Sequence, residues 1–292
     1  MDRLMIVVVL TAVIHLINTL IYSVRPAGVI TKRLATAYSL FNVIFLIAQT
    51  SNMLQAPLLG SIVDLTIKRG SEAAGRAVQY INTPGYQQEL LVLDHEMRII
   101  LLGATLGTLV GVFFIPAFIG FFVRGIDLFD QVKSVPKMMG KILCSPLKVG
   151  KSLKGAVRIP NRKFFKQALT EKLTIPRKFL ILNIVITGVY TTAVLSSMYA
   201  CALYPDFRTT TAYLSGVING IATILFATVV DPTAASITDQ ALRGERPEQD
   251  VRQMSFYLGI TRLLGTVLAQ IIFIPAAYII QYVAKLIAQG GF

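Results

Sequence analysis

The chain has 292 residues, of which 54% are apolar and only 15% charged, and its mean hydropathy is +0.64. This composition excludes an ordinary soluble domain, in which about a quarter of the residues are charged. The formal net charge of +13 is concentrated in one segment, because residues 124–178 contain 14 Lys/Arg and three Asp/Glu.

Six segments are long and apolar enough to cross a hydrocarbon core of about 30 Å. They cover roughly 4–24, 34–63, 98–123, 179–204, 211–231 and 254–286. We therefore predict an all-α polytopic membrane protein with about six transmembrane helices. In the first segment, His15 and Asn18 interrupt the apolar run and no small-residue cleavage site follows, so we expect this span to be retained.

Two stretches of the sequence, 175 positions apart, resemble each other at eight of 32 ungapped positions. Duplication inside a membrane protein is typical of transporters. A second, shorter similarity follows each copy. The paired motifs are Arg33-x-x-Thr-Ala-Tyr with Arg208-x-x-Thr-Ala-Tyr, Pro57-x-x-x-Ser-Ile-x-Asp with Pro232-x-x-x-Ser-Ile-x-Asp, and Leu106-Gly-Thr with Leu264-Gly-Thr.

The basic segment fixes a predicted topology, because Lys/Arg-rich loops stay in the cytoplasm. The 25–33 and 244–253 connections then lie inside, and the 64–97 connection and both termini lie outside. The first copy lies in the second span and the second copy in the fifth, and these spans would cross the membrane in opposite directions, so the copies form an inverted pair. We expect three-helix repeats at 1–123 and 179–292, joined by a basic cytoplasmic loop at 124–178 with interfacial helices. That loop would attract anionic lipids, and it carries no nucleic-acid-binding motif.

The second span is unusually polar, with its amides and a tyrosine on one helical face. These residues are Tyr38, Asn42, Gln49, Asn52 and Gln55. An unsatisfied amide in hydrocarbon costs several kcal/mol, so this face must meet protein or water. Interhelical hydrogen bonding would satisfy two such residues, whereas a stripe of five favours a hydrated cavity.

Several ionisable residues lie within the spans. Arg262 lies in the last span, where it would pair with Asp231 or Asp239 or bind an anionic substrate. His15 is either a hydrogen-bonded packing residue or a proton carrier. Asp64, the counterpart of Asp239, is a candidate gate residue at the opposite membrane face.

Two prolines occupy corresponding positions of the repeat. We expect Pro57 and Pro232 to break their helices, because proline removes a backbone hydrogen bond and clashes with the preceding turn. Broken helices at equivalent positions indicate a transport site.

The sequence shows no catalytic triad, paired-carboxylate pattern, nucleotide-binding loop or metal-ligand cluster. We therefore expect no enzyme activity, no cofactor and no ATPase, and any transport would use an ion gradient, the membrane potential or a substrate gradient.

Three runs in the first two spans carry a family resemblance: Tyr22-Ser-Val-Arg25-Pro-Ala-Gly28, Ser39-Leu-Phe-Asn42-Val and Gln55-Ala-Pro57-Leu-Leu-Gly60. The later Asp231-Pro, Thr238-Asp and Gly244-Glu-Arg motifs add to it. Together they resemble the Amj family of bacterial lipid II flippases, which are alternates to MurJ. The resemblance extends over most of the chain and is weakest in the basic loop.

The resemblance implies movement of an undecaprenyl-pyrophosphate-linked disaccharide-pentapeptide to the outer leaflet of the bacterial cytoplasmic membrane. Arg25, Arg33 and Arg262 are the expected partners of the pyrophosphate. The stripe from Asn42 to Gln55 is the expected polar path, and the polyprenyl tail would stay in lipid. His15, Asp64, Asp231 and Asp239 are candidates for gating or proton coupling.

Two other functions remain open at this point. The same cavity would suit an ion-coupled exporter of other amphipathic or lipid-linked substrates. A non-transporting scaffold could instead organise cell-envelope proteins through its basic loop. Six spans are few for so large a substrate, so a homodimer is an open alternative to a monomer.

Overall fold

The computed structural model describes residues 2–75, 80–132 and 173–290, and every regular element in these ranges is helical. Six helical segments are long and apolar enough to cross a membrane, so the predicted all-α class and the number of spans are confirmed. The helices are α1 (Arg3–Leu20), α2 (Val24–Thr31), α3 (Leu34–Ala74), α4 (Pro84–Val132), α8 (Arg177–Leu203), α9 (Arg208–Leu225), α10 (Asp231–Leu242) and α11 (Glu248–Ala288).

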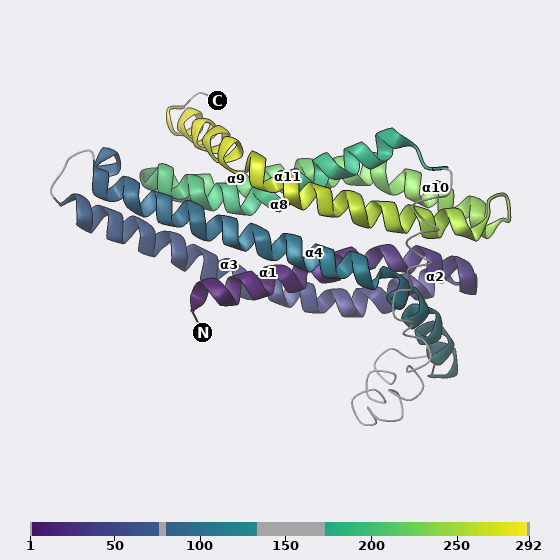
Figure 1. Ribbon diagram of the computed structural model, residues 1–292. Helices are drawn as coiled ribbons and strands as arrows, with labels where there is room; N and C mark the ends of the chain where they lie inside the picture. Colours follow the sequence, from purple (N-terminus) through teal and green to yellow (C-terminus); the bar gives the residue numbers. More distant parts are fainter. Residues whose placement is uncertain (1, 76–79, 133–172, 291–292) are drawn as a thin grey trace.

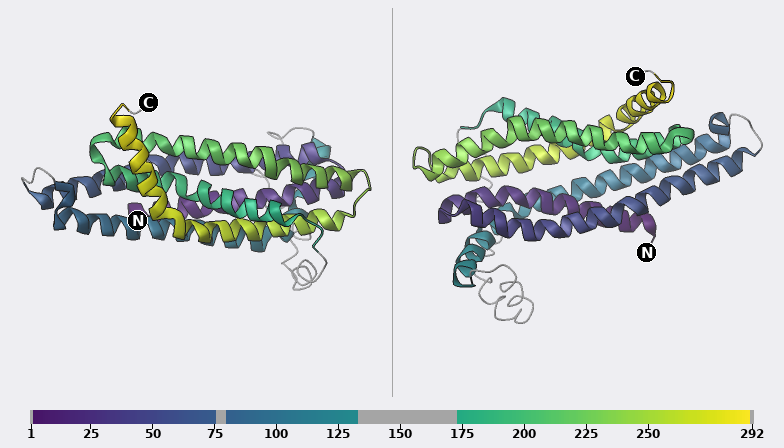
Figure 2. Two further views of the ribbon diagram at one scale, coloured as in Figure 1. Left: turned by 90° about the horizontal axis from the view of Figure 1, so that it is seen from above. Right: turned by 180° about the vertical axis from the view of Figure 1, so that it is seen from behind.

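The helices form an elongated bundle (Figure 1). At one end lie the α2–α3 and α10–α11 turns, and at the other lie the α3–α4 connection and the α8–α9 turn. We call these the α2–α3 end and the α3–α4 end. The two halves, α1–α4 and α8–α11, lie as two layers and traverse the bundle in opposite directions (Figure 2).

Each half contains one very close helix pair, α1 with α4 and α8 with α11. A Cβ on Gly107 in α4 would lie 2.1 Å from the carbonyl oxygen of Ala12 in α1. A Cβ on Gly265 in α11 would lie 2.8 Å from the carbonyl oxygen of Ile184 in α8. Small residues allow such approaches between membrane helices. Gly107 and Gly265 belong to the second pair of similar motifs, so the similarity reflects the same packing role in each half.

The halves are joined firmly near the α3–α4 end. The Arg98 guanidinium of α4 donates to the carbonyl oxygen of Gln270 in α11 at 3.1 Å, and the Gln270 amide donates back to the Arg98 carbonyl at 3.0 Å. The Tyr86 hydroxyl donates to the carbonyl oxygen of Ala202, which would otherwise be unpaired at the end of α8. A buried apolar cluster from both halves, which includes Leu59 and Tyr199, surrounds these bonds.

The prediction for Pro57 is wrong. Helix α3 continues through this residue from Leu34 to Ala74. A proline removes only one backbone donor, and packed neighbours hold the rest of a transmembrane helix in place.

At Pro232 the regular α-helix is interrupted, although the chain does not unwind. A π-helical turn at Phe226–Val230 precedes Pro232, and α10 begins at Asp231. The Thr233 hydroxyl donates to the carbonyl oxygen of Val229, which lies within the irregular turn, at 2.8 Å. Such π-turns are frequent at functional sites.

Helix α4 extends to Val132, beyond the predicted end of the third span at residue 123, and α8 begins at Arg177. The predicted interfacial helices of the basic segment lie mainly between 133 and 172, outside the described residues.

Candidate functional site

A polar cavity with two chambers lies between the two halves, and both chambers are lined by Asn18, Asn52 and Tyr190. The larger has a volume of about 330 Å³, and the smaller about 240 Å³. We call them the His15 chamber and the Arg262 chamber. Further polar residues of the His15 chamber are Thr11, His15, Gln55, Thr191 and Asn219, and those of the Arg262 chamber are Tyr22, Gln49, Thr187, Thr223 and Arg262.

The chambers follow one another along the bundle. The Arg262 chamber reaches Tyr22, which follows α1, and Phe45 in the first part of α3. The His15 chamber reaches Thr11 in α1 and Leu59 farther along α3. The Arg262 chamber is therefore nearer the α2–α3 end. A group moving through the bundle would meet the two chambers in sequence.

Arg262 is the only Lys, Arg, Asp or Glu among the described residues that line the two chambers. Its Nε atom is buried and lacks a hydrogen-bond partner, and within the described ranges Arg262 forms no ion pair. The predicted pairing of Arg262 with Asp231 or Asp239 is therefore not found in this structure. A guanidinium with unused donors beside a cavity is suited to bind an anion.

The second-span stripe is only partly at the cavity. Gln49, Asn52 and Gln55 line the chambers, whereas Asn42 does not line either one. The Gln55 amide donates to the Thr11 hydroxyl at 2.7 Å, and the Asn52 amide donates to the Gln49 carbonyl oxygen at 3.3 Å. The stripe thus combines the two arrangements considered from the sequence, a cavity wall and interhelical hydrogen bonding.

At the α2–α3 end, Arg25 of α2 donates to the Asp231 carboxylate of α10. Its guanidinium also lies 3.5 Å from the Thr238 hydroxyl and over the Tyr38 ring, 5.6 Å from the ring centroid. The Arg25 side chain is 12% exposed and that of Asp231 is 55% exposed. These contacts join α2, α3 and α10. Sequence reasoning singled out both charged residues but did not pair them.

At the α3–α4 end, Arg208 at the start of α9 donates to Asp64 of α3 at 3.1 Å. Both side chains are more than half exposed. The repeat relates this pair to Arg33 and Asp239, which lie in the elements at the opposite end of the bundle. Neither Arg33 nor Asp239 lines the two chambers.

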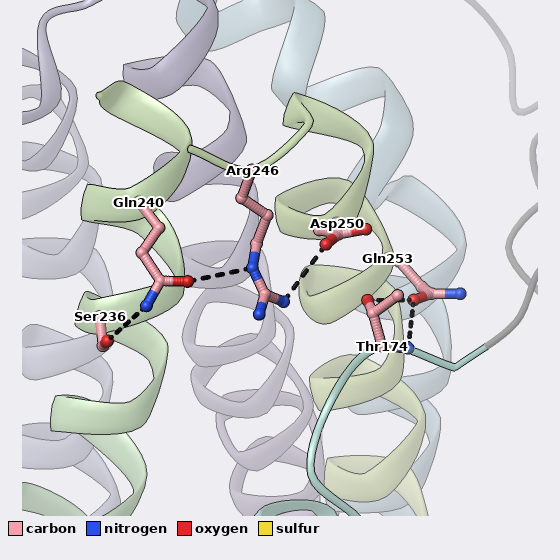
Figure 3. A network of polar contacts seen from close by, with 6 residues as sticks. All are labelled: Thr174, Ser236, Gln240, Arg246, Asp250 and Gln253. Atoms are coloured by element: carbon pink, nitrogen blue, oxygen red, sulfur yellow. Dashed lines mark hydrogen bonds and ion pairs between the residues drawn. The ribbon is translucent and has the colours of Figure 1, made fainter. Parts of the chain in front are cut away.

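A polar network fixes the α10–α11 turn (Figure 3). Arg246 donates to the Gln240 side chain at 3.1 Å and to the Asp250 carboxylate at 3.2 Å. Nearby, the Thr174 hydroxyl donates to the Gln253 side chain at 3.2 Å, which ties the segment before α8 to α11. Arg246 ends the Gly244-Glu-Arg motif, so this part of the motif has a structural role.

Five polar lining residues of the second half were not predicted from the sequence: Thr187, Tyr190 and Thr191 of α8 and Asn219 and Thr223 of α9. A signal existed on α8, where Thr187, Tyr190 and Thr191 follow the three- and four-residue spacing of one helical face. On α9, Asn219 and Thr223 are four residues apart and also lie on one helical face.

The family model described as "Amj: Alternate to MurJ" matches residues 10–284. The chain belongs to the Amj family. A relative from Bacillus subtilis (strain 168), named "Lipid II flippase Amj", is 34% identical to this family member over 274 residues, which are 93% of each chain. The family resemblance drawn from the sequence motifs is confirmed. No solved structure gives a significant match.

Proposed function

We propose that this Amj family member is a lipid II flippase that moves the lipid-linked peptidoglycan precursor from the inner to the outer leaflet of the cytoplasmic membrane. It works by alternating access and without an ATPase of its own. One observation carries the proposal: a polar cavity between the two halves contains an arginine without a counter-charge among its described lining residues. The name of the Bacillus subtilis relative supports the choice of substrate.

The α2–α3 end is assigned to the cytoplasm. The basic segment 124–178 joins the bundle at this end, because α4 ends and α8 begins there. Lys/Arg-rich loops remain cytoplasmic. The substrate would therefore enter at the α2–α3 end and leave at the α3–α4 end.

The Arg262 chamber is assigned to the pyrophosphate, because a guanidinium suits phosphate oxygens. Gln49 and Asn52 of α3 and Thr223 of α9 border this chamber and are exposed, so polar groups reach the bundle surface there. The polyprenyl tail would pass between α3 and α9 and stay in the bilayer.

The chambers are small for so large a headgroup. Pockets for drug-sized ligands occupy about 300–1,000 Å³. Chambers of about 330 and 240 Å³ are at or below the small end of that range. Each chamber would hold one group of the substrate. Binding of the complete headgroup would require the two halves to move apart.

The two ion pairs are assigned as gates, Arg25–Asp231 on the cytoplasmic side and Asp64–Arg208 on the outer side. Arg25 would exchange the Asp231 carboxylate for a phosphate oxygen as the inner gate opens. Arg33, Asn42 and Asp239 would act near the cytoplasmic entrance. The two halves would rock against each other as inverted repeats. Within each half, the closely packed helix pair, α1 with α4 or α8 with α11, would move as a unit.

The test uses bacteria depleted of their essential lipid II flippase, with lipid II at the outer surface as the measured quantity. The wild-type chain should restore growth and surface lipid II. Arg262→Ala should abolish both while reaching the membrane at normal levels. Arg252→Ala, an exposed arginine on the same helix, is the matched control and should behave as wild type.

Failure of the wild-type chain to restore surface lipid II would favour an exporter of other amphipathic compounds. Deletion of residues 134–170 distinguishes the scaffold hypothesis from the flippase hypothesis. A scaffold that acts through the basic loop loses its function, whereas the transport core retains surface lipid II.

A further inference from the structure

The His15 chamber contains buried polar atoms without partners. The Nδ1 atom of His15, the hydroxyl oxygen of Thr191 and the side-chain oxygen of Asn219 are buried and make no hydrogen bond in the described structure. His15 and Thr191 are each only 8% exposed. Buried polar groups are nearly always hydrogen-bonded, so these atoms point to water or to a ligand in the chamber.

The side chains that line the chamber distinguish between the classes of ligand that it could bind. Among the described lining residues there is no Lys, Arg, Asp or Glu, and the polar groups present, an imidazole, amides and hydroxyls, stand beside aliphatic side chains such as Leu59 and Val194. A phosphate would favour a cation, and a peptide with free carboxylates or ammonium groups would favour opposite charges. A neutral group with many hydroxyls or an acetamido group needs only hydrogen-bond donors and acceptors. A sugar fits this description.

The two chambers are positioned to receive two linked groups. Asn18, Asn52 and Tyr190 line both chambers. A sugar bonded directly to a pyrophosphate could therefore occupy the His15 chamber while the pyrophosphate contacts Arg262. The sugar would lie nearer the α3–α4 end.

We propose that the His15 chamber is a sugar subsite, in which Thr191 and Asn219 hydrogen-bond the first sugar of the lipid-linked substrate. This inference rests on the proposed function, since it requires the pyrophosphate to occupy the Arg262 chamber. It assigns a binding role to two residues of the second half, whereas the polar stripe of α3 belongs to the first half.

The experiment measures binding of two lipids to the purified full-length chain in nanodiscs. The probes are lipid II and undecaprenyl pyrophosphate, which has the same tail and pyrophosphate but no sugar. Thr191→Val and Asn219→Ala should each weaken lipid II binding by about tenfold, because each removes about one hydrogen bond to the ligand. Both should bind undecaprenyl pyrophosphate as wild type does. Arg262→Gln should weaken the binding of both lipids.

Thr192→Val is the matched control. Thr192 is adjacent in sequence and buried, but its hydroxyl donates to the Gly188 carbonyl of its own helix at 2.9 Å and it does not line the chamber. Thr191→Ser keeps the hydroxyl and should keep the affinity for lipid II. This second variant preserves the test if Thr191→Val folds poorly.

Three outcomes overturn the inference. If Thr191→Val and Asn219→Ala leave lipid II binding unchanged, the chamber holds only water. If they weaken the binding of both lipids equally, the chamber does not distinguish the sugar. If the wild-type chain binds neither lipid, the proposed function fails and the subsite fails with it.

Discussion

Replacement of Gly107 by alanine is expected to force α1 and α4 apart. The new Cβ would lie 2.1 Å from the carbonyl oxygen and 2.7 Å from the carbonyl carbon of Ala12. A favourable carbon–oxygen contact is about 3.3–3.6 Å long, so the helices must separate by roughly 1 Å. The obstructing atoms belong to the backbone and cannot rotate away.

The expected magnitude follows from two opposing contributions. Overpacking costs about 1–3 kcal/mol, and a clash with backbone belongs at the upper end. Alanine also favours the helix over glycine by about 1 kcal/mol. The free energy of unfolding should therefore fall by about 2 kcal/mol, the difference between these contributions. Gly265→Ala should act in the same direction, since its Cβ would lie 2.8 Å from the Ile184 carbonyl oxygen.

Gly220→Ala in α9 is the matched control, because no atom lies within 4 Å of its added Cβ. The assay is reversible unfolding of the purified protein in mixed micelles. Gly107→Ala should unfold more easily than wild type, whereas Gly220→Ala should be unchanged or more stable. Equal responses at Gly107 and Gly220 would refute the close packing of α1 on α4.

Two further predictions concern contacts between helices. A double-mutant cycle with Arg25→Gln and Asp231→Asn should give a coupling energy of about 1–2 kcal/mol in the same unfolding assay. The exposed Asp64–Arg208 pair should give a coupling energy of less than about 1 kcal/mol. A larger coupling energy for this pair than for Arg25–Asp231 would contradict the argument, because the Arg25 side chain is the more buried one. Asn183→Ala should lower the unfolding free energy by about 1–3 kcal/mol, because its buried amide donates two hydrogen bonds to α11. Wild-type stability of that variant would show that these bonds are dispensable.

Hydropathy was sufficient to predict the number of candidate membrane spans and their approximate centres. It could not predict their full length, since α4 extends from Pro84 to Val132 and its polar ends carry no apolar signal. Hydropathy also could not distinguish a helix that continues through a proline from one that is interrupted there. Pro57 and Pro232 occupy corresponding positions of the two similar stretches, but only Pro232 is preceded by a π-helical turn.

The helical period placed Gln49, Asn52 and Gln55 on one face, and these residues line the chambers. Asn42 lies more than one turn earlier on α3 and falls outside the chamber walls. The sequence left open whether Arg262 pairs with Asp231 or Asp239 or binds an anionic substrate, because the rotation of each helix depends on packing with its neighbours. In the folded chain the Asp231 carboxylate meets Arg25, which leaves Arg262 facing the cavity.

The two similar copies form chemically unequal walls. Gln49, Asn52 and Gln55 of the first copy line the chambers, whereas the corresponding Ile224, Ala227 and Val230 of the second copy do not. If the halves exchange conformations during transport, a substrate meets different surroundings in the inward-facing and outward-facing states. A ligand shifts such an equilibrium only by its difference in affinity between the states. Equal walls would give equal affinities, whereas unequal walls would allow tight binding at one face and release at the other. Their asymmetry does not set the net direction, since a carrier without an energy source follows its gradients. Net outward movement then requires coupling to a gradient or continuous consumption of the lipid at the outer face.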